Sequence, residues 1–287
     1  MTATDGKAGM RLVLTYYVVT FVISWGGLMT VVGGPRGVLG TPGRFEALLP
    51  MVIMALLAGP IVSGILMTAL AGGRAGLREL LARLLTWRVA GRWYAAALLV
   101  APLAAMTIFL TLSLFSDTFV PAILAADDRV SCLVTGLATG VAAGMFEELG
   151  WTGFAIPNLR RRYGVFATGL IVGWLWAVWH IVPALWLGYS SGTLRGTLSL
   201  VSYLADPFLF LMVFRVLMVW VYDRTGSLLV AMLMHMSLTS SARIITPAGI
   251  VGAPLITFGV VWAVVMWSLV ALLVGRDRDS LARSPTD

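Results

Sequence analysis

Eight long apolar segments constrain the fold of this 287-residue chain more than any other feature of its sequence. A helix needs roughly 20 mostly apolar residues to cross a bilayer, and the segments that meet this length are 12–33, 47–71, 93–115, 131–155, 165–187, 201–222, 227–246 and 250–274. With 59% hydrophobic and 11% charged residues, the chain lies far outside the composition of soluble domains. The sequence therefore predicts an all-α, polytopic membrane helical bundle that forms one integral-membrane domain over residues 1–287.

Three segments at the borders of these spans carry further predictions. The first apolar segment is too long for a signal-peptide core, so it is expected to stay as the first span. Residues 74–92 have leucines at helical spacing and arginines on the other face, which predicts one interfacial amphipathic helix; an ordinary connector between two spans fits equally well. The tail 275–287 is predicted to be disordered.

The distribution of basic residues predicts the orientation in the membrane. Cytoplasmic loops of membrane proteins carry an excess of Lys and Arg. With the N-terminus inside, the cytoplasmic segments hold Lys7, Arg11, Arg74, Arg78, Arg83, Arg88, Arg92, Arg160, Arg161, Arg162, Arg224, Arg276, Arg278 and Arg283. The opposite side holds Arg36, Arg44, Arg129 and Arg195, with Arg243 near a span end. Both termini are therefore expected to be cytoplasmic, with the protein in the plasma membrane.

The same distribution explains the net charge of +7. Because the arginines lie between hydrophobic spans, we expect the positive charge to interact with the lipid bilayer. We expect no nucleic acid as a partner.

Four ionisable residues lie inside or at the end of apolar spans. His180 and His235 are the two histidines of the chain, and Glu147-Glu148 end a third span. Each alone has a simpler explanation: solvated carboxylates at the interface, or hydrogen-bonded packing histidines. Ionisable groups in a bilayer are costly, and they usually face a cavity, pair with each other and mark function. Together the four predict one polar site within the membrane.

Small residues near the glutamates predict how that helix packs. Gly136, Gly140 and Gly144 recur every four residues, a pattern that lets helix backbones approach closely in lipid. Glu148 continues this stripe and should point into a packed interface. Glu147 lies about 100° around the helix, on the face of Trp151. The two carboxylates are therefore expected to have different roles.

Hydrolysis is the chemistry that such a set supports. A carboxylate and an imidazole can hold and deprotonate one water, either directly or through a bound metal. A second histidine, with a hydroxyl one turn later, can stabilise the oxyanion of a tetrahedral intermediate. The chain contains no HExxH motif, and Asp206 has no intramembrane aspartate partner. The one-helix zinc site and an aspartyl mechanism are therefore poorly supported.

The order of these motifs resembles a known family. Glu147-Glu148 with Trp151, then Trp176 to His180, then His235 to Thr239 are similar to the EExxxR, FxxxH and HxxxN motifs of the CPBP intramembrane proteases. This family contains the type II CAAX prenyl endopeptidases and the Abi proteins. The resemblance covers residues 131–246, which we take as the core catalytic region.

The resemblance implies a role for each site residue. Glu147 and His180 would activate the water, and His235 and Thr239 would form the oxyanion site. Glu148 would hold these residues in place without contacting the substrate. If a metal is used, Zn²⁺ bound by Glu147, His180 and His235 is expected; a metal-free, glutamate-activated water is the alternative.

Three positions depart from the family pattern: Thr152 replaces arginine, Trp176 replaces phenylalanine and Thr239 replaces asparagine. Losing the arginine removes the expected partner of Glu148. Arg215, a charge inside another span, could supply that partner from a different helix.

The resulting functional prediction is a membrane-embedded, metalloprotease-type endopeptidase that cuts a peptide or protein substrate near the cytoplasmic membrane face. The alternative is a non-catalytic family member that acts as a peptide- or protein-binding immunity or scaffold protein; Thr152 and Thr239 support it. A transporter with a proton relay is the third reading. It fits less well because the polar residues are confined to the C-terminal half.

Overall fold

The computed structural model describes residues 3–276 and, within them, eight helices long and apolar enough to cross a membrane. They are α1 (Ala3–Val32), α3 (Phe45–Leu84), α4 (Gly91–Ser113), α6 (Arg129–Gly150), α8 (Val165–Ser190), α9 (Thr197–Thr225), α10 (Leu228–Ile245) and α11 (Ala253–Arg276). Short helical turns are α2 (Pro35–Val38), η1 (Pro42–Arg44), η2 (Asp117–Phe119), α5 (Ala122–Ala125), η3 (Trp151–Ala155) and α7 (Ile156–Arg160). The described range contains no strand. The predicted all-α bundle of eight spans is therefore confirmed.

The tail predicted to be disordered falls almost wholly outside this range. Residues 275 and 276 end α11, and residues 277–287 lie outside the described residues.

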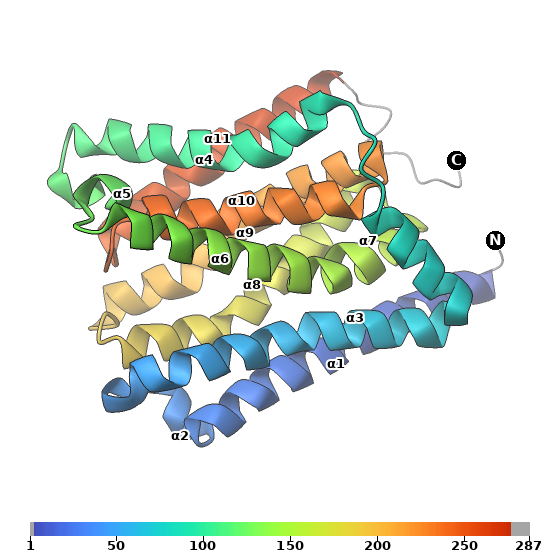
Figure 1. Cartoon of the computed structure of the whole chain (residues 1–287), viewed down its shortest axis with the longest axis horizontal. Helices are drawn as coiled ribbons and strands as arrows, with labels where there is room; N and C mark the ends of the chain where they lie inside the picture. Colours follow the sequence, from blue (N-terminus) through green and yellow to red (C-terminus); the bar gives the residue numbers. More distant parts are fainter. Residues whose placement is uncertain (1–2, 277–287) are drawn as a thin grey trace.

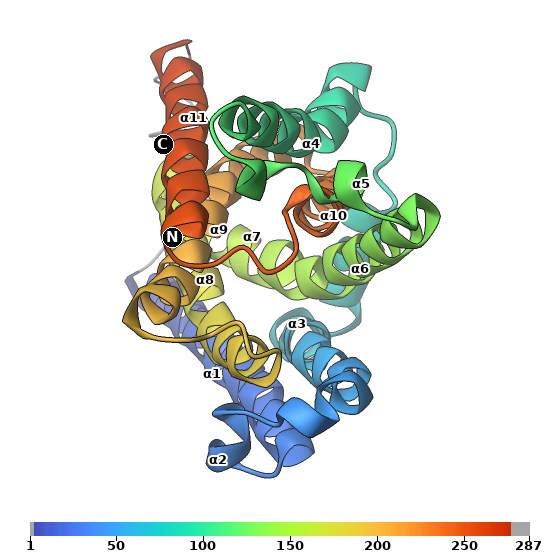
Figure 2. The same cartoon turned by 90° about the vertical axis from the view of Figure 1, so that its left-hand side faces the viewer.

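The helices that carry the predicted site lie at the centre of the bundle. Figures 1 and 2 show α6, α8, α9 and α10 between the pair α1–α3 on one side and α4 and α11 on the other. Within this centre, α8 packs along α9, and α10 packs against both α6 and α4. The ionisable residues are thus held by helices that are covered by other helices rather than by lipid alone.

Close approach of α6 and α10 depends on the predicted glycine stripe. A Cβ atom at Gly140 would lie 2.1 Å from Ser240 Oγ, and one at Gly144 would lie 2.5 Å from the Met232 carbonyl oxygen. Such distances leave no room for any side chain, so the two backbones meet directly along this stripe. The stripe points Glu148 toward α10, as its position in the sequence predicts.

The segment 74–84 differs from the expected separate helix. It continues α3 beyond a kink at Gly73, whose φ of 53° is readily available to glycine. One face packs against the bundle, since Leu80 is buried with Leu228 and Met232, whereas Leu81 is exposed. The predicted helical amphipathicity is present, but the helix ends at Leu84, and residues 86–90 belong to no helix.

The span that carries the glutamates is longer than expected and contains a π turn. α6, η3 and α7 form one continuous helical segment from Arg129 to Arg160, and η3 is the π-helical part. Pro157 stands at the start of α7 and has no N–H to donate, which favours a break in the regular hydrogen-bond ladder just before it. The segment therefore extends past the predicted end at residue 155.

A tight turn connects α9 to α10. Gly226 ends α9 with a φ of 61° in the left-handed region, a conformation that glycine adopts at little cost. Ser227 then caps α10, because its hydroxyl accepts a hydrogen bond from the Val230 N–H at 3.1 Å. This turn makes α9 and α10 an antiparallel pair and brings the middle of α9 beside the site.

Candidate active site

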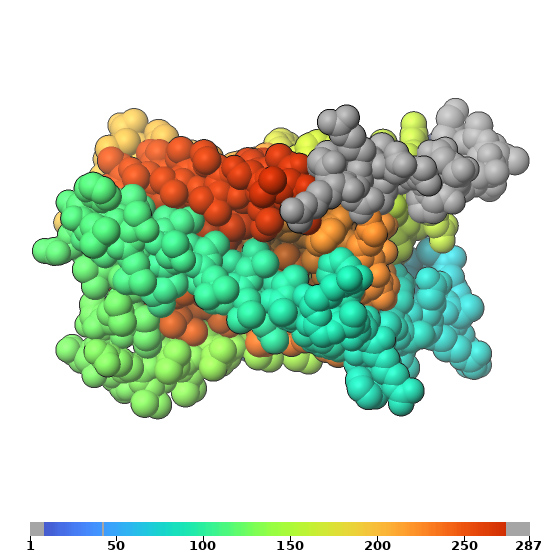
Figure 3. All heavy atoms as spheres, turned by 90° about the horizontal axis from the view of Figure 1, so that it is seen from above, coloured from blue at the N-terminus to red at the C-terminus, as the bar shows by residue number. Residues whose placement is uncertain are grey.

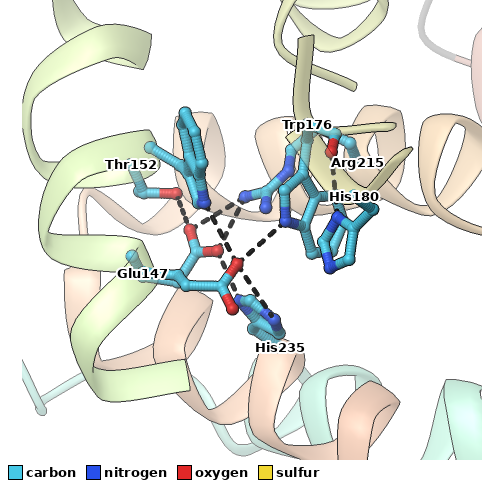
Figure 4. Close-up of polar contacts among 8 residues, drawn as sticks. Glu147, Thr152, Trp176, His180, Arg215 and His235 are labelled. Atoms are coloured by element: carbon cyan, nitrogen blue, oxygen red, sulfur yellow. Dashed lines mark hydrogen bonds and ion pairs between the residues drawn. The ribbon is translucent and has the colours of Figure 1, made fainter. Parts of the chain in front are cut away.

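Glutamate and histidine side chains from three helices meet at the centre of the bundle (Figure 4). Glu147 and Glu148 lie near the end of α6, His180 lies in α8, and His235 lies in α10. His235 Nδ1 is 2.7 Å from Glu148 Oε1, and His235 Nε2 is 4.0 Å from Glu147 Oε2. His235 is therefore a neighbour of both glutamates, and His180 lies beside Trp176, which donates a hydrogen bond to Glu147. The catalytic roles of the four residues stay predictions.

The convergence depends on the length of the helical segment that carries the glutamates. Counted from a span end at residue 155, His180 would lie deeper in the membrane than the glutamates. Because α7 prolongs the glutamate-bearing segment to Arg160, Glu147 and His180 stand at similar distances from the ends of their helical segments. The π turn and α7 thus bring the two residues to the same level.

Arg215 supplies the positive charge that Glu148 needs. Its Nη1 atom lies 2.9 Å from Glu148 Oε1 and 2.8 Å from Oε2, and both side chains are fully buried. Thr152 also donates a hydrogen bond to Glu148 Oε2. The hypothesis that Arg215 replaces the arginine missing at position 152 is confirmed by these contacts. A buried carboxylate is stable only when paired and hydrogen-bonded in this way.

The Glu147 carboxylate is held by two tryptophans. Its Oε2 atom accepts hydrogen bonds from Trp151 Nε1 at 3.2 Å and from Trp176 Nε1 at 2.9 Å. Within the described residues, no hydrogen bond reaches Oε1, and this atom is not among the fully buried atoms that lack a partner. Two donors on one oxygen fix the carboxylate plane and leave the second oxygen available to a reactant.

Trp176 contacts both Glu147 and Arg215, the ion-pair partner of Glu148. The Arg215 guanidinium lies over its ring, with Cζ 4.0 Å from the ring centroid, while its edge donates to Glu147. A cation over an indole face is attracted by the ring quadrupole. The tryptophan at this position therefore makes a hydrogen bond that the phenylalanine of the family pattern could not make.

The histidine contacts define which ring nitrogens are available. His180 Nδ1 lies 2.9 Å from the Trp176 carbonyl oxygen, and His235 Nδ1 lies against the Glu148 carboxylate. Both partners accept hydrogen bonds, so both Nδ1 atoms carry the proton, and the chemistry is left to Nε2 of each ring. His180 is partly exposed, whereas His235 is 2% exposed.

Thr239 lies one turn after His235 on α10 and is partly exposed. Its hydroxyl makes no hydrogen bond to any residue within the described range 3–276. An unused donor at this position is compatible with the predicted oxyanion role.

The possible metal ligands are spread out around the site. Among residues 3–276, no three His, Cys, Asp or Glu side chains are grouped closely enough to hold one. Glu147 Oε2 is also occupied by two indole N–H groups. Zn²⁺ at Glu147, His180 and His235 therefore stays a prediction.

All of these residues lie in one recognisable stretch of the chain. The model of the family described as type II CAAX prenyl endopeptidase Rce1-like matches residues 129–241. The match begins at the first residue of α6 and ends within α10, so it includes every predicted site residue. The resemblance read from the motifs is confirmed, and this part of the chain has the sequence pattern of an Rce1-like membrane protease family.

A curated relative with the same type of name matches a shorter stretch. CAAX prenyl protease 2 from Methanococcus maripaludis is 45% identical to this chain over 38 residues. The aligned stretch covers 13% of this chain and 14% of the relative. The activity of the whole protein is therefore a matter for proposal and experiment.

Sequence reasoning missed the two tryptophans as partners of Glu147. One signal was present, because Trp151 lies four residues after Glu147 and so shares its helix face. No sequence signal pairs Trp176 with Glu147, because the two residues lie on different helices and are 29 positions apart in the sequence.

Proposed function

We propose that this protein is a membrane-embedded endopeptidase that hydrolyses peptide bonds with a water held by Glu147 and His180. The observation that carries the proposal is the fixed Glu147 carboxylate, whose Oε2 atom is occupied by two indoles while Oε1 receives no hydrogen bond from the described residues. The match of residues 129–241 to an endopeptidase family supports the same reaction class.

The water is activated by two acceptors. One water proton points to Glu147 Oε1 and the other to Nε2 of His180, whose Nδ1 proton is engaged by the Trp176 carbonyl. A water that donates both protons presents its lone pair to the scissile carbonyl carbon. Glu147 takes one proton as the water oxygen forms its bond to that carbon, in the manner of a general base.

His235 and Thr239 stabilise the oxyanion that this attack creates. Glu147, Glu148 and Arg215 together carry one excess negative charge, so a protonated His235 makes the cluster neutral, as a buried site favours. Its Nε2–H then donates to the oxyanion, together with the Thr239 hydroxyl. Collapse of the intermediate breaks the C–N bond, and the proton on Glu147 passes to the leaving amine.

This proposal has two versions, one without a metal ion and one with Zn²⁺. In the metal-free version His235 is doubly protonated and donates, whereas a Zn²⁺ ligand would be neutral and would use the Nε2 lone pair. We favour the metal-free version because of the donor arrangement described above. Elemental analysis of the purified protein, with activity measured after chelation, tests this choice.

The proposed substrate is a peptide segment that enters from the cytoplasmic membrane face. Because the matching family and the curated relative both carry CAAX prenyl in their names, the first probe is a quenched fluorescent peptide that ends in a farnesylated Cys-aliphatic-aliphatic-X sequence. The same peptide without the farnesyl group is the matched probe. Cleavage of the second probe alone would support a protease with unprenylated substrates.

The decisive variants are Glu147→Gln and His180→Ala. Each should lower kcat by about 10²–10⁴-fold, the usual contribution of a positioned acid–base group. Gel filtration and thermal unfolding should match those of the wild type, because neither change removes enough volume to collapse the bundle. Unchanged cleavage in the Glu147→Gln, His180→Ala double variant would defeat the protease proposal.

A binding protein that does not cleave is the second candidate, favoured by Thr239 in place of the family's asparagine. Thr152 gives this candidate less support, since the charge lost at that position is supplied by Arg215. A binding role predicts that the cellular phenotype survives Glu147→Gln and is lost with substitutions on a contact surface.

A further inference from the structure

An open groove lies away from the glutamates, between the beginning of α4 and the end of α9. It has a volume of about 390 Å³ and is lined by Arg92, Trp93, Ala96, Trp220 and Arg224. Two of these five residues are arginines and two are tryptophans. The groove therefore has a positive rim and an aromatic floor.

The aromatic floor and the arginines form an ordered unit. The Trp93 and Trp220 rings meet with centroids 5.2 Å apart and an interplanar angle of 66°. Arg92 Cζ lies 5.2 Å from the Trp93 centroid, and Arg224 Cζ lies 6.0 Å from the Trp220 centroid. Each guanidinium thus lies over an indole of its own helix, Arg92 on α4 and Arg224 on α9.

The position of the groove matches a membrane surface. Arg92 is in the first turn of α4 and Arg224 is in the last turn of α9, on the side that the basic residues predict to be cytoplasmic. Figure 3 shows surface of the α9–α10 region (orange) exposed beside the start of α4 (teal). Further along α4, on the face of Ala96, Leu99 and Leu103 are 49% and 60% exposed. An apolar track therefore leads from the groove toward the membrane interior.

We propose that this groove binds the headgroup of an anionic phospholipid. The phosphate lies between Arg92 and Arg224, whose guanidinium groups suit bidentate contacts to phosphate oxygens. The glycerol backbone lies on the Trp93–Trp220 pair, since tryptophans favour this level of the bilayer. One acyl chain follows Ala96, Leu99 and Leu103. The inference is independent of the proposed protease activity, because none of these residues contacts Glu147 or the two histidines.

Lipid retention by the full-length purified protein tests the proposal. Native mass spectrometry can compare binding of phosphatidylglycerol and phosphatidylcholine with identical acyl chains. Wild type should prefer phosphatidylglycerol, and the Arg92→Gln, Arg224→Gln double variant should bind it about thirtyfold more weakly. This fold-change follows from about 1 kcal/mol for each arginine near an anionic surface. Replacing both arginines by lysine should restore part of the affinity, since lysine keeps the charge but loses the fork geometry.

Arg78→Gln is the matched control, because Arg78 is exposed on the same predicted side and lies outside the groove. An equal loss of affinity in this control would overturn the site in favour of diffuse attraction. Displacement of the lipid by millimolar inorganic phosphate would overturn the acyl contact. If the double variant does not fold, equal retention of both lipids by the wild type is sufficient to reject the proposal.

Discussion

At the level of single residues, Arg215 shows that a charge can be kept while its place in the sequence changes. Glu148 is fully buried and would be very unfavourable in lipid without a cation. The related pattern places that cation four residues later on the same helix, where this chain has Thr152. Here the guanidinium of Arg215 reaches Glu148 from α9. Thr152 donates one hydrogen bond to the same carboxylate.

The stability of the protein should depend on this pair. Arg215→Ala leaves Glu148 buried without its cation, which should lower the free energy of unfolding by about 3–5 kcal/mol. Thermal unfolding and the monodisperse fraction in detergent measure the loss. The second-site change Thr152→Arg should recover part of it by restoring the related pattern. Arg243→Ala is the control, since Arg243 has no ion pair among the described residues; equal losses in both variants would contradict the assignment.

Trp176 is expected to act by positioning Glu147. Trp176→Phe removes one of the two indole donors to Glu147 Oε2 and weakens the stacking of Arg215. Loss of one hydrogen bond to a charged group is worth about 1.5–3 kcal/mol, so kcat should fall by roughly tenfold to a hundredfold with KM little changed. Trp174→Phe, at a 52% exposed position on the same helix, should leave both constants unchanged. A similar fall in both variants would argue for general destabilisation instead.

At the level of helices, the segment that carries the glutamates has two structural features that position them, a glycine stripe and a π turn. Its glycine stripe lets α6 lie against α10, and its π turn at Trp151–Ala155 changes the direction of the side chains just after the carboxylates. Trp151 and Thr152 lie in this turn and donate to Glu147 and Glu148 respectively. π turns are frequent at functional sites because they place side chains where a regular helix cannot.

Packing of α6 against α10 can be tested with a single methyl group. Gly140→Ala places a Cβ atom against Ser240 Oγ and the Met236 carbonyl oxygen, so the helices must separate. The expected cost is about 1–3 kcal/mol of unfolding free energy, measured by thermal unfolding. Gly26→Ala is the control because nothing lies within 4 Å of a Cβ atom there. That change should be neutral or stabilising by up to about 1 kcal/mol. A tolerated Gly140→Ala would mean that the interface is looser than described.

At the level of the whole molecule, the bundle surrounds its polar centre with apolar helices on both sides (Figure 2). The even number of spans places the beginning of α1 and the end of α11 on the same side of the bundle (Figure 1). Which side faces the cytoplasm is predicted by the arginines alone.

Cysteine labelling tests that orientation. In a Cys132→Ser background, which removes the chain's one cysteine, Asp127→Cys and Arg88→Cys place single thiols at exposed positions on opposite sides. A membrane-impermeant maleimide should label Asp127→Cys in intact cells and Arg88→Cys only after permeabilisation. The reverse pattern would invert the topology and move the proposed cleavage to the other membrane face.

Much of this architecture follows from the sequence because a bilayer restricts what apolar segments can do. Local patterns of length and spacing predict the eight spans and the glycine stripe that directs Glu148. The π turn was not predicted, although Gly153 and Pro157 mark an irregular helix. The Trp176–Glu147 contact joins two helices, and no local pattern reports how one helix is rotated against another.

The distance along the chain between Glu148 and Arg215, 67 residues, has a consequence for biogenesis. Segments are made in order, so α6 is synthesised with its carboxylates before the helix that holds their cation exists. Until α9 follows, Glu148 must stay hydrated at the insertion machinery or at the membrane surface, because an unpaired charge in lipid is costly. Stable integration of α6 is therefore completed by a later helix, and a nascent chain that stops before α9 should leave α6 accessible to aqueous reagents.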